Sequence, residues 1–388
     1  MKALFVGVAA MNTAMAGAST AATLIASHTA GDGWSGLPGA AGVLGTAAGT
    51  LGAGHLISLR GSKTALLFPY GAAMTGAALA AGTAMALLIA GMFLLGLGNG
   101  AAQLSRYLAA EAFPPHRKGF AISLIVWAGT VGAVVGPNLI APGAALAGTV
   151  GLPSLAGPML VAFVMTGGAL LVTTTLRRTP APPARRTSFA ALRAPAVVTP
   201  LVSMVCAQLT MVAVMTMTPL ELEAHHHGLE VLGVVLSVHM IGMFALAPLS
   251  GRLADRFGGR AVILGGVALL LLAAVTAFGV GHVSGLSVAM FLLGYGWNLV
   301  FVGGSALLSR ATSDQRVQGA VDAVVWSTSA LASLGSGVLF GLGGYALVTV
   351  VGAVLALLPL TVLYRRPAPA APEPRPLPAS AGPRSPRR

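Results

Sequence analysis

The sequence predicts an all-α polytopic membrane protein with twelve transmembrane helices in two parallel six-helix repeats. Of its 388 residues, 56% are hydrophobic and only 8% are charged, whereas a soluble domain carries roughly a quarter charged residues. Apolar runs recur along the chain, and a helix needs about 20 such residues to cross the roughly 30 Å hydrocarbon layer. Features of the first half also return in the second. A transmembrane β-barrel would instead show short alternating segments.

Twelve apolar runs have the length of a membrane-spanning helix. The first of them, with Lys2 ahead of it, is long for the apolar region of a secretory signal, so we interpret it as a span. The predicted spans cover residues 3–27, 37–57, 64–82, 84–109, 119–141, 154–176, 196–219, 229–250, 261–281, 285–308, 317–340 and 344–364.

The longest connection divides the spans into two halves. It is rich in Arg and Pro, and a Pro-, Ala- and Arg-rich stretch of the kind that stays disordered follows the last span. The predicted organisation is a first six-helix bundle, a cytoplasmic linker, a second six-helix bundle and a disordered basic cytoplasmic tail, over residues 1–176, 177–195, 196–364 and 365–388.

Basic residues set the predicted orientation, because cytoplasmic loops of membrane proteins are enriched in Lys and Arg. With the N-terminus in the cytoplasm, all 22 Lys and Arg fall on the cytoplasmic side. We therefore expect a multi-pass protein of the bacterial inner (plasma) membrane with both termini in the cytoplasm. The net charge of +13 follows from this topology and does not indicate nucleic acid binding. The opposite face receives Asp32, Glu221, Glu223, Glu230 and the run His225 to His227.

Similar motifs recur at equivalent places in the two halves. The loop GRLADRFGGR, Gly251 to Arg260, has a weaker copy in GHLISLRGSK, Gly54 to Lys63, which starts 197 residues earlier. FLLGLGN at 93–99 returns as FLLGYGWN at 291–298. Six helices per half make both halves enter the membrane from the same side, so the repeat is parallel.

This repeat and its loop resemble the major facilitator superfamily of secondary transporters, over roughly residues 1–364. The family's loop signature has the form G-x-L-a-D-r-x-G-r-[KR] and is normally stronger in the first half. Here the stronger copy lies in the second half, with Asp255 at the acidic position where the first half has Ser58. The resemblance implies two bundles that rock about a central cavity and a cytoplasmic latch concentrated in one half.

The span at 119–141 carries a second resemblance. Gly129, Gly132, Gly136 and Pro137 look like part of the family's antiporter signature, although its final glycine pair is replaced by Ile140 and Ala141. This partial match favours export over uptake.

Asp255, Arg256 and Arg260 are the predicted gating residues of the second-half loop. An ionised Asp255 only accepts hydrogen bonds, so it suits backbone N–H groups at a helix N-terminus and nearby guanidinium groups. The family resemblance places Phe120 beside it, with Arg117 close by. The alternative is a loop that only fixes topology by its positive charge.

Three further polar residues inside the spans are candidates for gating or proton coupling, because charges within a bilayer are costly and are functional by default. Asp322 is a protonatable coupling residue or, as the resemblance suggests, a latch partner of Arg60 or Lys63. Arg106 contacts substrate or extends toward the membrane interface. His239 is a proton carrier or a hydrogen-bonded packing residue.

The remaining candidates are chiefly amides on the first, fourth, seventh and tenth spans, which line the cavity in the family. Unsatisfied amides in lipid are costly, so they should face inward, where they contact substrate or bond neighbouring helices. The expected substrate-binding residues are Asn12, Asn99, Gln103, Gln208, Trp297 and Asn298. Trp127 and Trp326 are cavity walls or packing residues.

The function that these features predict is secondary active transport of a small neutral or amphipathic organic solute, coupled to protons, with export favoured. The alternatives are an uptake facilitator and a sensor with a transporter fold. The chain has no nucleotide-binding loop or catalytic triad, so we expect no enzyme activity and no cofactor. The histidine run is a solvated loop or a metal site. The expected partners are the lipid bilayer, the solute and protons, without nucleic acid, and the expected unit is a monomer.

Overall fold

The computed structural model describes residues 1–30, 34, 36–82, 84–149, 151–177, 189–225, 229–279 and 283–364, and nearly all of them are helical. A π-helical turn, Ile241–Ala245, joins α8 to α9. The helices are α1 (Lys2–Ala30), α2 (Leu37–Ala80), α3 (Met85–Glu111), α4 (Lys118–Asn138), α5 (Ile140–Thr149), α6 (Gly157–Thr174), α7 (Pro195–Ala224), α8 (Leu229–Met240), α9 (Ala247–Phe257), α10 (Gly259–Gly279), α11 (Val283–Ala311) and α12 (Gln315–Leu363).

Ten segments of the described chain are long and apolar enough to cross a membrane. Two of them, α2 with 44 residues and α12 with 49, are about twice the length that one crossing requires. Each contains a sharp bend, at Gly61 in α2 and at Gly343 and Gly344 in α12. Each therefore contributes two spans, and the twelve predicted helices are confirmed.

The repeat seen in the sequence is also present in the backbone. Gly61 in the bend of α2 has φ 78°, and Gly258 between α9 and α10 has φ 86°. A side chain with a Cβ rarely adopts this left-handed region, whereas glycine enters it freely. The two copies of the loop motif thus use a glycine at the same position to make the same reversal.

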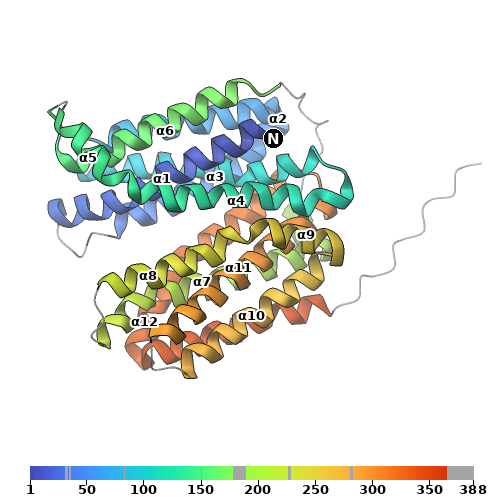
Figure 1. Ribbon diagram of the computed structural model, residues 1–388. Helices are drawn as coiled ribbons and strands as arrows, with labels where there is room; N and C mark the ends of the chain where they lie inside the picture. The colour runs from blue at the N-terminus through green and yellow to red at the C-terminus, as the bar shows by residue number, and fades with distance from the viewer. Residues whose placement is uncertain are drawn as a thin grey trace, which may run out of the picture.

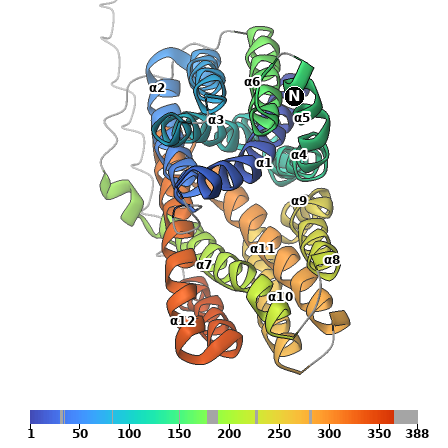
Figure 2. The same ribbon diagram turned by 90° about the vertical axis from the view of Figure 1, so that its left-hand side faces the viewer.

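The helices form two bundles, with α1 to α6 in one and α7 to α12 in the other (Figures 1 and 2). Each bundle surrounds a cluster of buried apolar side chains, and each cluster also takes in a few residues of the other bundle where the two meet. The first apolar run is the helix α1, which packs against α4 and α6. The most extensive contacts between the bundles are those of α2 with α12 and of α4 with α9.

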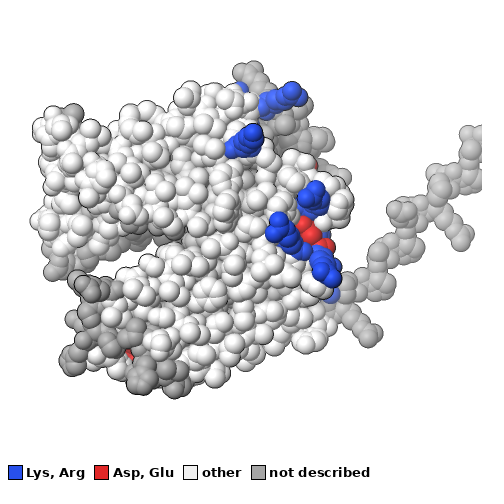
Figure 3. Space-filling model, in the orientation of Figure 1, with Lys and Arg blue, Asp and Glu red and all other residues white. Residues whose placement is uncertain are grey.

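Basic side chains gather at one end of the molecule, at the right of the face drawn in Figure 3. Several bonds tie the helix ends together there. Lys63 in the bend of α2 donates to the carbonyl of Thr174 at the end of α6. Lys118 at the start of α4 donates to the carbonyl of Ser309 near the end of α11, at 3.2 Å. We call the end of the molecule where these basic side chains gather the basic end.

Some predictions fall on parts of the chain that are not described. These are Asp32, His226, His227, most of the linker (178–188) and the tail (365–388). Within the described residues, no three His, Cys, Asp or Glu side chains come together as a metal site would require.

Candidate substrate cavity and inter-bundle gate

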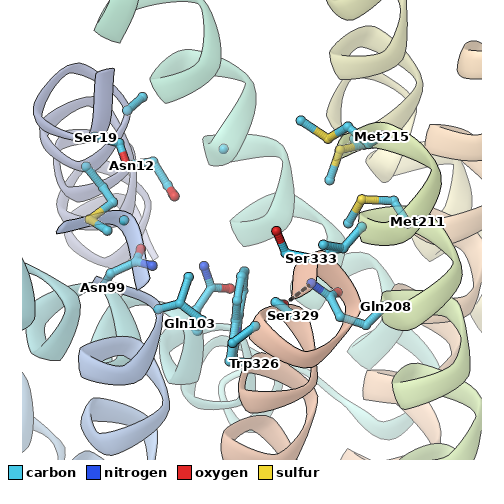
Figure 4. A pocket seen from close by; sticks show the side chains of 18 of the residues that line it. Asn12, Ser19, Asn99, Gln103, Gln208, Met211, Met215, Trp326, Ser329 and Ser333 are labelled. Atoms are coloured by element: carbon cyan, nitrogen blue, oxygen red, sulfur yellow. Dashed lines mark hydrogen bonds between the residues drawn. The ribbon is translucent and has the colours of Figure 1, made fainter. Parts of the chain in front are cut away.

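A cavity of about 940 Å³ lies between the two bundles, and the face in Figure 3 is hollowed at the end opposite the basic end. Its lining includes Ser19 on α1 and Trp34 and Leu37 at the α1–α2 connection. The cavity is therefore open at this far end. In Figure 4, Asn12, Asn99 and Gln103 of the first bundle face Gln208, Met211 and Ser329 of the second.

Five of the six predicted substrate-binding residues line this cavity: Asn12, Asn99, Gln103, Gln208 and Trp297. Gln208 is held by two bonds, because its Oε1 accepts from Trp297 Nε1 and its Nε2 donates to Ser329 Oγ, both at 2.8 Å. Asn99 Nδ2 donates to Thr46 Oγ1 at 3.1 Å. These bonds fix the amide orientations before any solute enters.

Asn298, the sixth predicted binding residue, lies outside the cavity lining. It is fully buried between helices of the second bundle, where its Nδ2 donates to the Met243 carbonyl and its Oδ1 accepts from Ser250 Oγ, both at 2.6 Å. The structure therefore assigns it to helix–helix bonding. It follows Trp297 directly in α11, and adjacent positions of a helix point about 100° apart, so the two side chains cannot share a face.

Arg106 and Asp322 form an ion pair across the two bundles at the cavity floor. Arg106 Nη2 lies 2.5 Å from Asp322 Oδ1, and the two side chains are 1% and 0% exposed. The guanidinium also donates to Ser305 Oγ, the Gln103 carbonyl and the Tyr107 hydroxyl. Tyr107 in turn donates to Asp322 Oδ1 at 3.2 Å.

This pair rules out one alternative for each of two predicted residues. Asp322 does not pair with Arg60 or Lys63 of the α2 bend; its partner is Arg106. Arg106 lines the cavity and does not extend to the membrane interface. The pairing was missed, although the sequence carried a signal for it. Arg106 lies five residues before the end of α3 and Asp322 seven after the start of α12, at similar depths from the same end.

Asp255 joins the bundles nearer the basic end. Its carboxylate accepts from the backbone N–H groups of Gly119 and Phe120, each at 2.8 Å, at the start of α4. The predicted neighbour Phe120 is thus in contact, but the guanidinium partner is Arg310, at 3.2 Å, and not Arg117. Arg117 lies over the Phe120 ring. Arg256 lies over Phe257, and Arg260 is exposed at the start of α10.

Two seams close the cavity at the basic end, each made by repeat-related glycines. In the α4–α9 seam, a Cβ on Gly251 would lie 2.5 Å from the carbonyl oxygen of Gly119. In the α2–α12 seam, a Cβ on Gly54 would lie 2.5 Å from the Gln315 carbonyl oxygen, and one on Gly319 would strike that of Thr50. Real Cβ atoms do not approach this closely, so the two backbones touch.

His239 and Trp127 lie away from the cavity. His239 is fully buried, with Nδ1 2.8 Å from the Met290 carbonyl, and this arrangement matches the packing interpretation. Trp127 is 40% exposed, and its ring lies 5.8 Å from that of Phe5. Trp326, its counterpart 199 residues later, does line the cavity.

Known sequences resemble most of this chain. A family model described as Major Facilitator Superfamily matches residues 200–388. The uncharacterized MFS-type transporter YdeG of Bacillus subtilis (strain 168) is 30% identical over 375 residues, which cover 90% of this chain and 87% of the relative. The riboflavin transporter RfnT of Brucella anthropi is 30% identical over 346 residues, 83% and 84% of the two chains.

The chain belongs to the major facilitator superfamily. Solved structures show the same fold at low sequence identity. The human organic anion transporter MFSD10 (TETRAN) superposes with a TM-score of 0.75 at 16% identity, covering 93% of this chain and 98% of that one. FucP, crystallised in the outward conformation, gives a TM-score of 0.70 at 16% identity, with 92% and 97% covered. Transport across a membrane is the activity of the family, so the cavity between the bundles is the candidate transport site.

Proposed function

We propose that this facilitator is a proton-coupled secondary transporter that moves a small neutral or amphipathic organic solute across the bacterial inner membrane, with export favoured. The observation that carries the proposal is the Arg106–Asp322 pair. It joins the two bundles at the floor of a cavity that is open at one end.

The positive-inside rule supports the orientation, because the basic side chains gather at one end. That end, with the start of α1 and the end of α12, then faces the cytoplasm, and the cavity opens to the outside. Alternating access requires the two seams to part while the far end closes. Asp255 would then leave the N–H groups of Gly119 and Phe120, and Arg106 would leave Asp322.

Proton coupling follows from the charges that this separation would expose. Breaking a buried ion pair by removing one partner costs about 3–5 kcal/mol, because the other charge stays in a poorly polar environment. Protonation of Asp322 removes the charge that Arg106 would leave behind. Asp322 Oδ2 has no hydrogen-bond partner among the described residues, so it can receive that proton. Arg106 stays charged and keeps Tyr107 and the Gln103 carbonyl on its own helix.

The proposed direction of transport and the choice of the first solute to test come from resemblance to known transporters. The partial antiporter motif on α4 supports export, and its glycines pack this helix closely on α1: a Cβ on Gly136 would lie 2.8 Å from that of Ala16. The riboflavin transporter among the relatives makes riboflavin the first compound to test.

The test is flux in proteoliposomes, with and without a pH gradient, for riboflavin and then for other uncharged solutes. We expect Asp322→Asn to abolish gradient-driven accumulation and to retain solute counterflow, because only the latter needs no net proton movement. The matched control is Asp314→Asn, the N-cap of the same helix, which accepts from Arg316 N at 2.9 Å and which Asn also caps well.

Three outcomes would contradict the proposal. Accumulation by Asp322→Asn equal to that of the wild type would remove this residue from coupling. Solute binding by the wild type without flux in either direction would favour the sensor. Flux that ignores the pH gradient in the wild type would leave a facilitator without proton coupling.

A further inference from the structure

We propose that the exposed side of the α4–α9 seam binds the headgroup of an anionic phospholipid at the basic end, and that this headgroup bridges the two bundles. Its phosphate would lie between Arg117, just ahead of α4, and Arg252 on α9. The inference goes beyond the proposed function, because it concerns a site outside the cavity and holds for any solute. It depends on how the two arginines meet, on their lack of acidic partners and on the apolar surface beside them.

Two arginines from different bundles meet at one aromatic ring. The guanidinium carbon of Arg117 lies 5.8 Å from the centroid of the Phe120 ring, and that of Arg252 lies 5.1 Å from the same centroid. The ring is held at the seam, because the backbone N–H of Phe120 donates to Asp255. The ring attracts both cations, but the cations repel each other. An anion that both guanidinium groups contact would turn this repulsion into attraction.

These two arginines have no acidic partner in the part of the chain that the structure describes. Both side chains are exposed, and neither takes part in an ion pair or a hydrogen bond with a described residue. The neighbouring carboxylate of Asp255 already accepts from Arg310 and from two backbone N–H groups. In Figure 3, basic side chains surround a small acidic area over α9. Guanidinium groups bind phosphate oxygens in a fork-like geometry, so the charge here suits a phosphate.

The surface next to the arginines is apolar and favours a lipid over a free phosphate. On α9, exposed Leu249 lies one turn deeper in the membrane than Arg252, on the same face of the helix. On α4, exposed Trp127 lies two turns deeper than Phe120, also on the same face. Acyl chains would cover these side chains while the phosphate stays at the arginines. Basic pockets between transmembrane helices on the cytoplasmic side bind anionic headgroups in this way.

A headgroup at this position would favour one state of the transporter. Arg117 belongs to the first bundle and Arg252 to the second, so one phosphate can contact both only while the α4–α9 seam is closed. A ligand that binds one conformation more tightly shifts the population toward it. Anionic lipid would therefore stabilise the conformation that the structure shows, in which the cavity is open at the far end.

The experiment measures lipid binding to the purified full-length protein by native mass spectrometry. The probe is phosphatidylglycerol, and the comparison is phosphatidylcholine with the same acyl chains, in which choline compensates the phosphate charge. An arginine near an anionic lipid contributes about 1 kcal/mol, or about fivefold in affinity. With two arginines, we expect phosphatidylglycerol to bind at least tenfold more tightly than phosphatidylcholine. Inorganic phosphate at the same concentration as the lipid should not compete.

Variants of the two arginines locate the site. Arg117→Gln and Arg252→Gln should each lower phosphatidylglycerol affinity about fivefold. In the double variant the second substitution should have less effect than the first, because both side chains hold the same phosphate. The matched control is Arg193→Gln, which removes an exposed arginine from the turn Phe189–Arg193, away from this seam. It should leave the affinity unchanged, and thermal melting of each variant verifies that it is folded.

A third substitution tests whether binding needs the closed seam. Gly251→Ala leaves both arginines in place but puts a methyl group against the Gly119 carbonyl oxygen, so it should weaken phosphatidylglycerol binding. Gly265→Ala, where a Cβ meets nothing within 4 Å, should not. Equal effects of these two substitutions would reject the bridge between the bundles.

Three further results would overturn the lipid site. These are equal affinities for the two lipids, competition by inorganic phosphate, and an effect of Arg193→Gln as large as that of Arg252→Gln. None of these measurements uses a solute or a pH gradient. A failure of the proposed function would therefore leave the lipid site intact, and loss of the lipid site would leave proton-coupled flux untouched.

Discussion

The α4–α9 seam and the α2–α12 seam close the same end of the cavity with the same backbone geometry but with different chemistry. Gly251 and Gly54, equivalent positions 197 residues apart, each bring a helix into backbone contact with the opposite bundle. Four residues further on, the first seam has Asp255 and the second has Ser58. The two seams therefore share a close backbone contact and differ in charge, because only the α4–α9 seam carries a carboxylate.

The two side chains make different numbers of bonds. Asp255 accepts from two backbone N–H groups and from Arg310. Ser58 accepts one bond, from Arg316 Nε at 2.6 Å. A hydrogen bond with an ionised partner contributes about 1.5–3 kcal/mol, and Asp255 makes three such bonds where Ser58 makes one. We therefore expect the α4–α9 seam to contribute more of the free energy that holds the basic end closed.

The largest effect should come from filling the backbone contact itself. Gly251→Ala places a methyl group 2.5 Å from the Gly119 carbonyl oxygen and against Ser123, so the seam cannot close without a helix shift. The matched control is Gly265→Ala on α10, where a Cβ meets nothing within 4 Å. Alanine in place of a helical glycine otherwise stabilises by about 1 kcal/mol, so loss of closure would be due to the clash.

A single cysteine can report whether the basic end is closed. Replacing Cys206, the only natural cysteine, with serine removes the only other thiol that could be labelled. Ser309→Cys then sits at a buried position one helical turn beyond Ser305, toward the basic end. An impermeant maleimide added to inside-out vesicles should label it rapidly in the Gly251→Ala protein and slowly in the control. Equal labelling rates would refute the role of the glycine contact.

The next effect in size should be removal of the carboxylate. In the structure, the Asp255 carboxylate accepts from two backbone N–H groups. In Asp255→Asn the side-chain NH₂ faces one of these donors, so at least one hydrogen bond to a charged acceptor is lost. Labelling of Ser309→Cys should rise about 10- to 100-fold, which corresponds to about 1.5–3 kcal/mol. Ser58→Ala in the other seam should raise it only about two- to tenfold, because Arg316 is half-buried and water can replace the lost acceptor. The seams would be energetically equivalent if the two substitutions had equal effects.

The sequence predicted the twelve helices because its signal, apolar length between charged turns, acts span by span. The family resemblance also placed Asp255 beside Phe120, and the structure confirms that contact. The sequence did not predict the Arg106–Asp322 pair or the internal bonding of Asn298. Both depend on how each helix is rotated about its axis within the packed bundles. Hydropathy leaves that rotation open when helices such as α4, α10 and α12 are apolar on every side.

The smallest expected effect tests which hydrogen-bond partner of Asp255 contributes most to holding the α4–α9 seam closed. Arg310 is 33% exposed and lies 3.2 Å from the carboxylate, at the rim of the seam. Exposed ion pairs contribute about 0–1 kcal/mol and weaken with salt. Arg310→Gln should therefore raise Ser309→Cys labelling by less than about fivefold, and high salt should abolish the difference from wild type. An effect as large as that of Asp255→Asn would mean that the ion pair, and not the helix N-terminus of α4, holds the seam closed.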